Sequence, residues 1–262
     1  MKERLLKHRD GAIVRWTLND PAHRNALDLD LVEELIAACT DAGADSTLRF
    51  IVLSGSGGAF CSGGNVAGFT EAIGRPWDEG HPDPLIAQSK RFGDLLHALS
   101  ALPQVLIAAV EGPAVAGGLG LVCCADFVIA APDAVFATPE VTLGIAPAQI
   151  APFVWRRLGD AAARRLLLQG RKLNAIEAEL LGLVDQVSED LAVSVNALID
   201  RLSRAAPGAV ALTKRLLGEL AGHAVLDVRE PAARAFVASL RSPEAHEGLA
   251  AFMSKRPPRW AR

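Results

Sequence analysis

The chain has 262 residues, of which half are hydrophobic but only 5% are aromatic, and it contains no tyrosine. We therefore expect one large domain or two modest ones, with an aliphatic core. The net charge of −3 argues against a nucleic-acid partner, because such proteins usually carry a basic excess. No apolar run approaches the ~18 residues that span a bilayer, and residues 1–10 lack the apolar stretch of a signal peptide. These features predict a cytoplasmic protein with no membrane partner.

Strands and helices are predicted to alternate in the first half of the chain. The expected strands are residues 12–18, 50–53, 105–110, 127–131 and 135–137. The expected helices are residues 28–42, capped by Asp28, then 85–101, and one that begins near 117. Residues 105–110 are continuously apolar, which is typical of a sheet covered on both faces. Glycines and prolines interrupt residues 70–84, where we expect a mobile loop.

The second half is predicted to be helical, apart from a short strand around residues 184–187. The expected helices are 149–158, 161–169, 175–181, 191–205, 209–220, 231–240 and 243–254. Residues 206–208 read Ala-Pro-Gly, which favours a boundary between a core, residues 1–206, and a C-terminal helical region, residues 207–262.

The cysteines and histidines do not show the spacing of metal ligands. Cys39, Cys61, Cys123 and Cys124 form no C-x-x-C pair, and the six histidines form no H-x-x-x-H pair. We expect Cys123 and Cys124 to be packing residues in an apolar helix, and we expect no metal site.

Two glycine clusters follow predicted strands, one at residues 61–65 and the other at residues 116–120. Glycine lets backbone amides approach a ligand closely, and a helix that begins there favours negative charge. The P-loop signature is absent, the third glycine of a dinucleotide-binding loop is replaced by Cys123, and no G-x-S-x-G frames a serine.

Several segments, in order, resemble the crotonase (enoyl-CoA hydratase/isomerase) superfamily. They are Leu18-Asn-Asp-Pro21 with Asn25-Ala-Leu27, Ala59-Phe-Cys-Ser-Gly-Gly-Asn65, residues 105–126, Phe136-Ala-Thr-Pro-Glu-Val-Thr-Leu-Gly144, residues 178–187, and residues 247–256. The resemblance covers nearly the whole chain. It implies an α/β fold in which a spiral of ββα turns forms the core and a helical C-terminal region forms trimers, often stacked in pairs as hexamers.

The resemblance also implies a set of catalytic groups. The backbone amides of Gly64 and Gly117 match the pair that holds the thioester oxygen, and Glu140 matches a glutamate that acts as general acid and base. Such amides stabilise an enolate-like oxygen by about 3 kcal/mol each. The competing interpretations are two ordinary tight turns and a surface glutamate that caps a turn.

Gly120 departs from the family pattern, because hydratases with two catalytic glutamates carry one at this position. Three consequences stay open. The protein hydrates its substrate with one glutamate, or it moves a double bond by shuttling one proton, or the missing side chain makes room for a bulky or branched acyl group. An inactive protein is a fourth possibility. Residues 147–153, Pro-Ala-Gln-Ile-Ala-Pro-Phe, also depart from the usual glycine-rich stretch and resemble members that act on branched or glutaconyl-type acyl groups. Two roles are open for Gln149. Its side chain hydrogen-bonds a polar acyl group, or it faces solvent.

The resemblance implies that coenzyme A is bound as part of the substrate, with no separate cofactor. Backbone at Ser62 and Gly64 and the side chains of Arg24 and Lys255 are the expected contacts, the last often from a neighbouring subunit. Solvated surface charge is the alternative for both basic residues. Asp126 is expected to be structural and to accept backbone N–H bonds.

We therefore expect an enoyl-CoA hydratase-type lyase that acts as a homotrimer or a dimer of trimers. The first alternative is an enoyl-CoA double-bond isomerase. The alternative from another class is a catalytically silent scaffold that binds coenzyme A thioesters.

Overall fold

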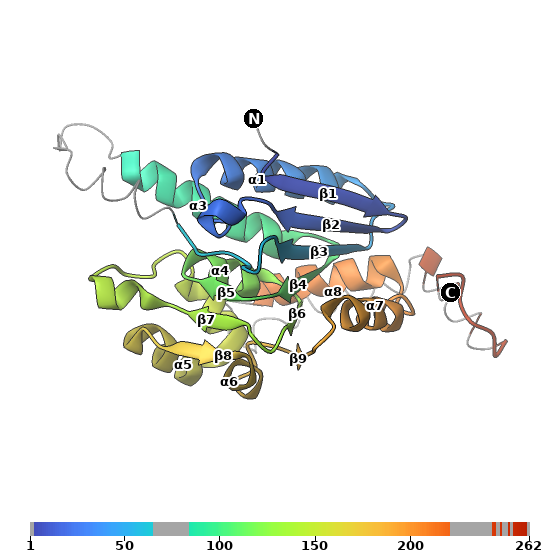
Figure 1. Ribbon diagram of the computed structural model, residues 1–262. Coiled ribbons are helices and arrows are strands. Elements are labelled where there is room, and N and C mark those ends of the chain that lie inside the picture. Colours follow the sequence, from blue (N-terminus) through green and yellow to red (C-terminus); the bar gives the residue numbers. More distant parts are fainter. Residues whose placement is uncertain are drawn as a thin grey trace.

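Two β-sheets form the framework of the protein, and helices surround them (Figure 1). The computed structural model describes residues 3–64, 84–220, 243, 244, 247, 251 and 254–260. Most of the loop predicted at residues 70–84 lies outside the described residues, and so do most of the helices predicted at 231–240 and 243–254.

The larger sheet has six strands in the order β1-β2-β3-β4-β6-β9. Their bounds are β1 Leu5–Asp10, β2 Ile13–Leu18, β3 Phe50–Gly55, β4 Val105–Val110, β6 Phe127–Ala130 and β9 Gln186–Val187. β1 and β2 are antiparallel, and the other neighbours are parallel. The parallel strands place their carboxyl ends at one edge of the sheet.

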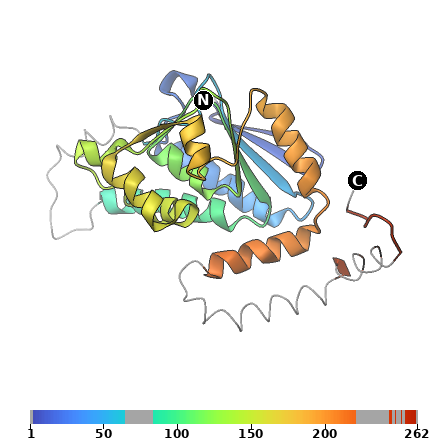
Figure 2. The same ribbon diagram turned by 90° about the horizontal axis from the view of Figure 1, so that it is seen from below.

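Helices cover both faces of this sheet, as the apolar run of β4 predicted. Side chains alternate between faces along a strand, so Leu106 and Ala108 join one apolar cluster and Val105 and Ile107 join another. The first cluster includes α1 and α3, and the second includes α7 (Figures 1 and 2). The helices in these layers are α1 Leu29–Ala44, α3 Pro84–Ala101, α7 Leu191–Leu202 and α8 Pro207–Leu220. Asp28 caps α1, accepting a bond from the Leu31 amide, as predicted.

The smaller sheet has the order β5-β7-β8, and two of its strands were not predicted. Its strands are β5 Pro113–Val115, β7 Val135–Ala137 and β8 Lys172–Asn174. β5 and β7 are parallel and β8 is antiparallel to β7. Helix α4 Gly117–Cys124 follows β5, and the short 3-10 helix η2 Pro139–Leu143 follows β7. An isolated bridge between Cys61 and Ala114 ties the first glycine cluster to β5.

The helices after η2 confirm the predicted helical second half. α5 Ala151–Gln169 breaks at Gly159, whose φ of 73° and ψ of 170° are not helical, so the two helices predicted there are two parts of one element. α6 Ala175–Leu180 follows with a capping box formed by Asn174 and Glu177.

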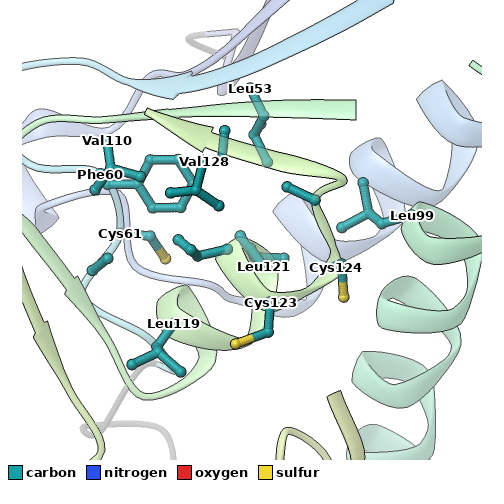
Figure 3. Packing of buried hydrophobic residues seen from close by; sticks show 14 of the residues in the cluster. Leu53, Phe60, Cys61, Leu99, Val110, Leu119, Leu121, Cys123, Cys124 and Val128 are labelled. Atoms are coloured by element: carbon teal, nitrogen blue, oxygen red, sulfur yellow. The ribbon is translucent and has the colours of Figure 1, made fainter. Parts of the chain in front are cut away.

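Cys123 and Cys124 are packing residues, as expected, and Cys61 is buried in the same apolar cluster. Figure 3 shows Cys61, Cys123 and Cys124 among apolar side chains such as Leu119 and Leu121. Burial raises the pKa of all three thiols to about 12, so they are neutral and unreactive at physiological pH.

Asp126 holds α8 onto the core. Its carboxylate accepts a 2.8 Å bond from the Leu106 amide and pairs at 2.5 Å with Nζ of Lys214 on α8. The predicted structural role of Asp126 is confirmed. Within the described ranges, no helix is long and apolar enough to cross a membrane.

Candidate active site

The two glycine clusters meet beyond the carboxyl ends of β3 and β4. The Cys61 amide donates to the Pro113 carbonyl at 3.0 Å, and the Val115 amide donates to the Cys61 carbonyl at 2.9 Å. A Cβ on Gly63 would lie 3.1 Å from the Gly117 nitrogen and 2.9 Å from Cβ of Ala116. Only glycine fits at position 63, because its φ of 86° is also unfavourable for other residues. The structure therefore brings the segments of Gly64 and Gly117 side by side.

Within the part of the chain that the structure describes, the amides of Gly64 and Gly117 donate to no acceptor. Gly117 is the first residue of α4, where unpaired N–H groups and the helix dipole favour negative charge. Ala116, just before it, adopts φ 50° and ψ −116°, a strained conformation for a residue with a Cβ. The Ala137 carbonyl accepts the Ala116 amide at 2.8 Å and holds this turn against β7.

Asn25 fixes the loop that leads into the first cluster. Its side chain is fully buried, and Nδ2 donates to the carbonyls of Ser56 and Ala59 at 3.0 and 2.7 Å. Its Oδ1 accepts the Asp20 amide at 2.8 Å. These bonds hold the backbone that presents Gly64, so Asn25 supports the site without lying in it.

Glu140 leaves the small sheet at the edge where α4 begins. β5 and β7 are parallel with Val115 opposite Ala137, so the chain after each strand emerges on the same side. Gly117 lies two residues after Val115, and Glu140 lies three residues after Ala137, in the first turn of η2. The structure thus places Glu140 and the Gly117 amide at one edge of the fold.

The Glu140 carboxyl is partly withdrawn from water, and one of its two oxygens has no donor among the described residues. Its Oε2 is buried, and no group of the described residues donates to it. Burial raises the pKa of this carboxyl above its ordinary value. An exposed turn-capping glutamate has neither property, and η2 has no side-chain cap. A carboxyl in such surroundings exchanges a proton closer to neutral pH.

The space beside Gly120 is filled, which the sequence did not reveal. A Cβ on Gly120 would lie 2.5 Å from Cγ2 of Ile150, and Ile150 is only 3% exposed. The hypothesis that the missing side chain opens room for an acyl group is therefore wrong at this position. Gln149 does not face solvent freely, because its Nε2 donates to Oγ of Ser89 on α3 at 3.1 Å.

The residues expected to hold coenzyme A are brought together only in part. The Ser62 amide donates to the Arg24 carbonyl at 3.0 Å, so these two lie beside Gly64. The segment of Lys255 lies instead near the amino ends of the strands, where the Trp260 indole donates to the Arg204 carbonyl (Figure 1). Within one chain, Lys255 and Ser62 are at opposite ends of the sheet.

Sequence reasoning did not single out Ile150, Ala116 or Thr138 for the site. The side chain of Thr138 is fully buried, and its Oγ1 donates to the Leu166 carbonyl at 3.2 Å, which fixes the start of η2. Pro139 after Thr138 was the one local indication of a fixed turn. The contact between Ile150 and Gly120 joins residues 30 positions apart, and no sequence pattern marks it.

Comparison with known proteins gives one consistent result. The family model described as "Enoyl-CoA hydratase/isomerase" matches residues 8–262. A Thermus thermophilus protein named "Putative enoyl-CoA hydratase" is 35% identical over 252 residues, which are 95% of this chain and 98% of that protein. The crystal structure of an enoyl-CoA hydratase/isomerase from Marinobacter aquaeolei is 40% identical, has a TM-score of 0.91 and covers 99% of each chain. Pseudomonas aeruginosa AtuE is also 40% identical, with a TM-score of 0.92, and covers 99% of this chain and 100% of its own. These structures confirm the predicted α/β crotonase fold.

Proposed function

This chain belongs to the enoyl-CoA hydratase/isomerase family, and on that premise we propose that it adds water to the double bond of an α,β-unsaturated acyl-CoA. The observation that carries the proposal is the buried Oε2 of Glu140, which has no donor among the described residues, at the edge where the Gly117 amide has no acceptor among them. A proton-transferring carboxyl and a pair of free amides are the two parts that enolate chemistry needs.

The reaction follows from these groups. The oxygen of water attacks the β-carbon while Glu140 takes a proton from that water. The electrons of the double bond move toward the thioester oxygen, whose negative charge is stabilised by the amides of Gly64 and Gly117. Glu140 then returns the proton to the α-carbon, which completes the addition of one water.

A second candidate function is that of an enoyl-CoA double-bond isomerase. The surroundings of Gly120 favour this candidate. Ile150 occupies the space that a glutamate side chain at position 120 would need, so Glu140 is the one carboxyl that we assign to the site among the residues that the structure describes. One carboxyl suffices to take a proton from the γ-carbon and return it at the α-carbon, while the double bond moves between them.

Substrate binding is proposed to involve coenzyme A at Ser62, Gly64 and Arg24, with Lys255 supplied by a neighbouring subunit of a homotrimer or dimer of trimers. The adjacency of Ser62 and Arg24 supports the first part, and the remoteness of Lys255 within one chain fits a contribution from another subunit. A branched or glutaconyl-type acyl group is the proposed class, from the form of residues 147–153.

The test measures loss of the enoyl-thioester absorbance on straight, branched and carboxylated enoyl-CoAs, with product masses. Gain of one water supports the hydratase, and a moved double bond without a mass change supports the isomerase. Glu140→Gln should lose about 100-fold or more of the activity and still bind coenzyme A. Silence across the panel with coenzyme A binding intact would contradict both and support a non-catalytic scaffold.

A further inference from the structure

Ile150 fills the space next to Gly120 so tightly that position 120 has no room for a side chain. We call Gly120 and Ile150 a matched pair for this reason. A Cβ at position 120 would lie 2.5 Å from Cγ2 and 3.3 Å from Cβ of Ile150, and 3.6 Å from Cδ2 of Leu96. Real Cβ atoms do not approach other atoms to 2.5 Å, and Ile150 is β-branched and buried, so it cannot swing aside without repacking.

This contact lies one helical turn from the proposed oxygen-binding amide. Gly117 and Gly120 are spaced i, i+3 in α4 and share a face. Opposite them on α3 lie Phe92, whose Cζ would be 3.2 Å from a Cβ on Gly117, and Leu96, which faces Gly120. A strip between α3 and α4 thus runs from Gly117 to Gly120, over a distance on the order of 5 Å, and Ile150 lies at its far end.

Ile150 is held at the end of this strip from both sides. Its carbonyl accepts the amides of Phe153 and Val154, each at 3.0 Å, at the start of α5. The preceding residue, Gln149, donates to Oγ of Ser89, and its Oε1 would lie 2.4 Å from a Cβ on Gly93. Because position 93 has no side chain, the side-chain amide of Gln149 can pack against α3.

We propose that Ile150 is a specificity-determining residue that closes the inner end of the acyl pocket, and that Gly120 is glycine because Ile150 fills its side-chain space. This inference rests on the proposed function, since it assumes that the thioester oxygen binds at Gly64 and Gly117. The end of the pocket is then formed by Ile150 and Leu96. Hydrocarbon suits such a wall, whereas a carboxylate buried there would lose its hydration without a partner. Between the two proposed acyl classes, the structure favours the branched hydrocarbon.

A thermal-stability cycle tests the matched pair without any substrate. Gly120→Ala should lower the Tm by roughly 5 °C in the wild-type background, because of overpacking. In an Ile150→Ala background the same change should leave the Tm unchanged or raise it, because the added methyl enters the vacated space. Gly218→Ala in α8 is the control, since a Cβ there meets nothing within 4 Å, and it should stabilise the protein slightly in both backgrounds. An equal fall for Gly120→Ala in both backgrounds would overturn the pairing.

A binding series tests the closure of the pocket. Saturated acyl-CoAs of increasing chain length, which have no double bond to react, are titrated calorimetrically into the wild type and Ile150→Ala. The wild-type affinity should stop rising at a shorter chain, whereas the variant should continue to gain about fourfold per added CH₂. Ile150→Val, which removes less volume, should fall between them and replaces Ile150→Ala if that variant does not fold. Parallel curves would overturn the specificity role. If no acyl-CoA binds any of the proteins, the proposed function fails as well, while the stability cycle still decides the pairing.

Discussion

At the scale of single residues, Glu140 has an energetic cost that its position explains. Its Oε2 is buried without a donor among the described residues, and an ionised oxygen in that state loses hydration that nothing replaces. Burial therefore raises the pKa of the carboxyl. Carboxyls with a raised pKa cluster at sites of proton exchange, which makes Glu140 the candidate for that role.

The raised pKa predicts a pH-dependent gain of stability in Glu140→Gln. Well below the ordinary glutamate pKa of about 4.3, the carboxyl is neutral in both the folded and the unfolded chain. Between that value and the raised folded value, the folded protein holds a proton that the unfolded chain lacks, so rising pH costs stability until the folded carboxyl also ionises. The free energy of unfolding of Glu140→Gln minus that of the wild type should grow with pH and then level off.

Urea denaturation at a series of pH values measures this difference. Glu111→Gln, which removes an exposed carboxyl from the same fold, is the control variant. A difference between Glu140→Gln and the wild type that is constant with pH would contradict the buried environment of Glu140.

At the scale of elements, η2 carries Glu140 and depends on α5 for its position. Thr138 precedes η2, is fully buried, and donates through Oγ1 to the Leu166 carbonyl of α5 at 3.2 Å. At the other end, Gly144 has a φ of 73° and ends the turn. The short helix is therefore fixed at its start by a tertiary bond.

Thr138→Val should lower kcat by about 10-fold or more while KM changes little, because a small displacement of the proton-transferring group is costly. The Tm should fall by only a few degrees, since the Leu166 carbonyl keeps other donors, the amides of Gly170 and Arg171. Thr40→Val removes the same kind of bond, Oγ1 to the Ile36 carbonyl, from α1 and should leave kcat unchanged. Steady-state kinetics on both variants decides this, and an unchanged kcat in Thr138→Val would remove its positioning role.

At the scale of the whole molecule, the residues proposed to contact the substrate do not all lie at the same end of the large sheet. Arg24 and Ser62 lie beside the glycine clusters. The segment of Lys255 is near the amino ends of the strands, where Nη2 of Arg49 donates to the Ser203 and Ala205 carbonyls and the Trp260 indole donates nearby. We therefore expect any contribution of the exposed Lys255 to coenzyme A binding to come from a neighbouring subunit.

Lys255→Ala should raise KM for an acyl-CoA on the order of fivefold, as expected for one solvent-exposed ion pair. It should leave KM unchanged for the acyl-pantetheine, which lacks the nucleotide phosphates. The increase in KM caused by Lys255→Ala should disappear at protein concentrations low enough for light scattering to show monomers. Arg24→Ala, from the same chain as the site, should keep its effect at every concentration. A KM for acyl-CoA that does not respond to Lys255→Ala would leave this residue as surface charge.

Much of the fold was readable in the sequence because local patterns determined it. The apolar run of β4, the Asp28 cap of α1 and the glycines after β3 each act on their own neighbours, and the structure has all three where they were predicted. β1 was missed because five of its six residues are exposed and four of those five are polar or charged, so it shows no apolar alternation. It is a strand because β2 supplies its hydrogen bonds, and its charges suit an edge. β5 and β8 are three residues each, too short to show a period.

The candidate site divides in the same way. The sequence by itself determined the family and the glycine clusters, and it singled out Glu140 as the candidate acid and base, because all of these lie in contiguous motifs. Only the tertiary structure decided that Oε2 of Glu140 is buried with no donor among the described residues, that Ile150 fills the space beside Gly120, and that Lys255 is remote from Ser62. Burial and steric exclusion are properties of atoms from distant segments packed together, and one chain position does not encode which distant side chain will lie against it.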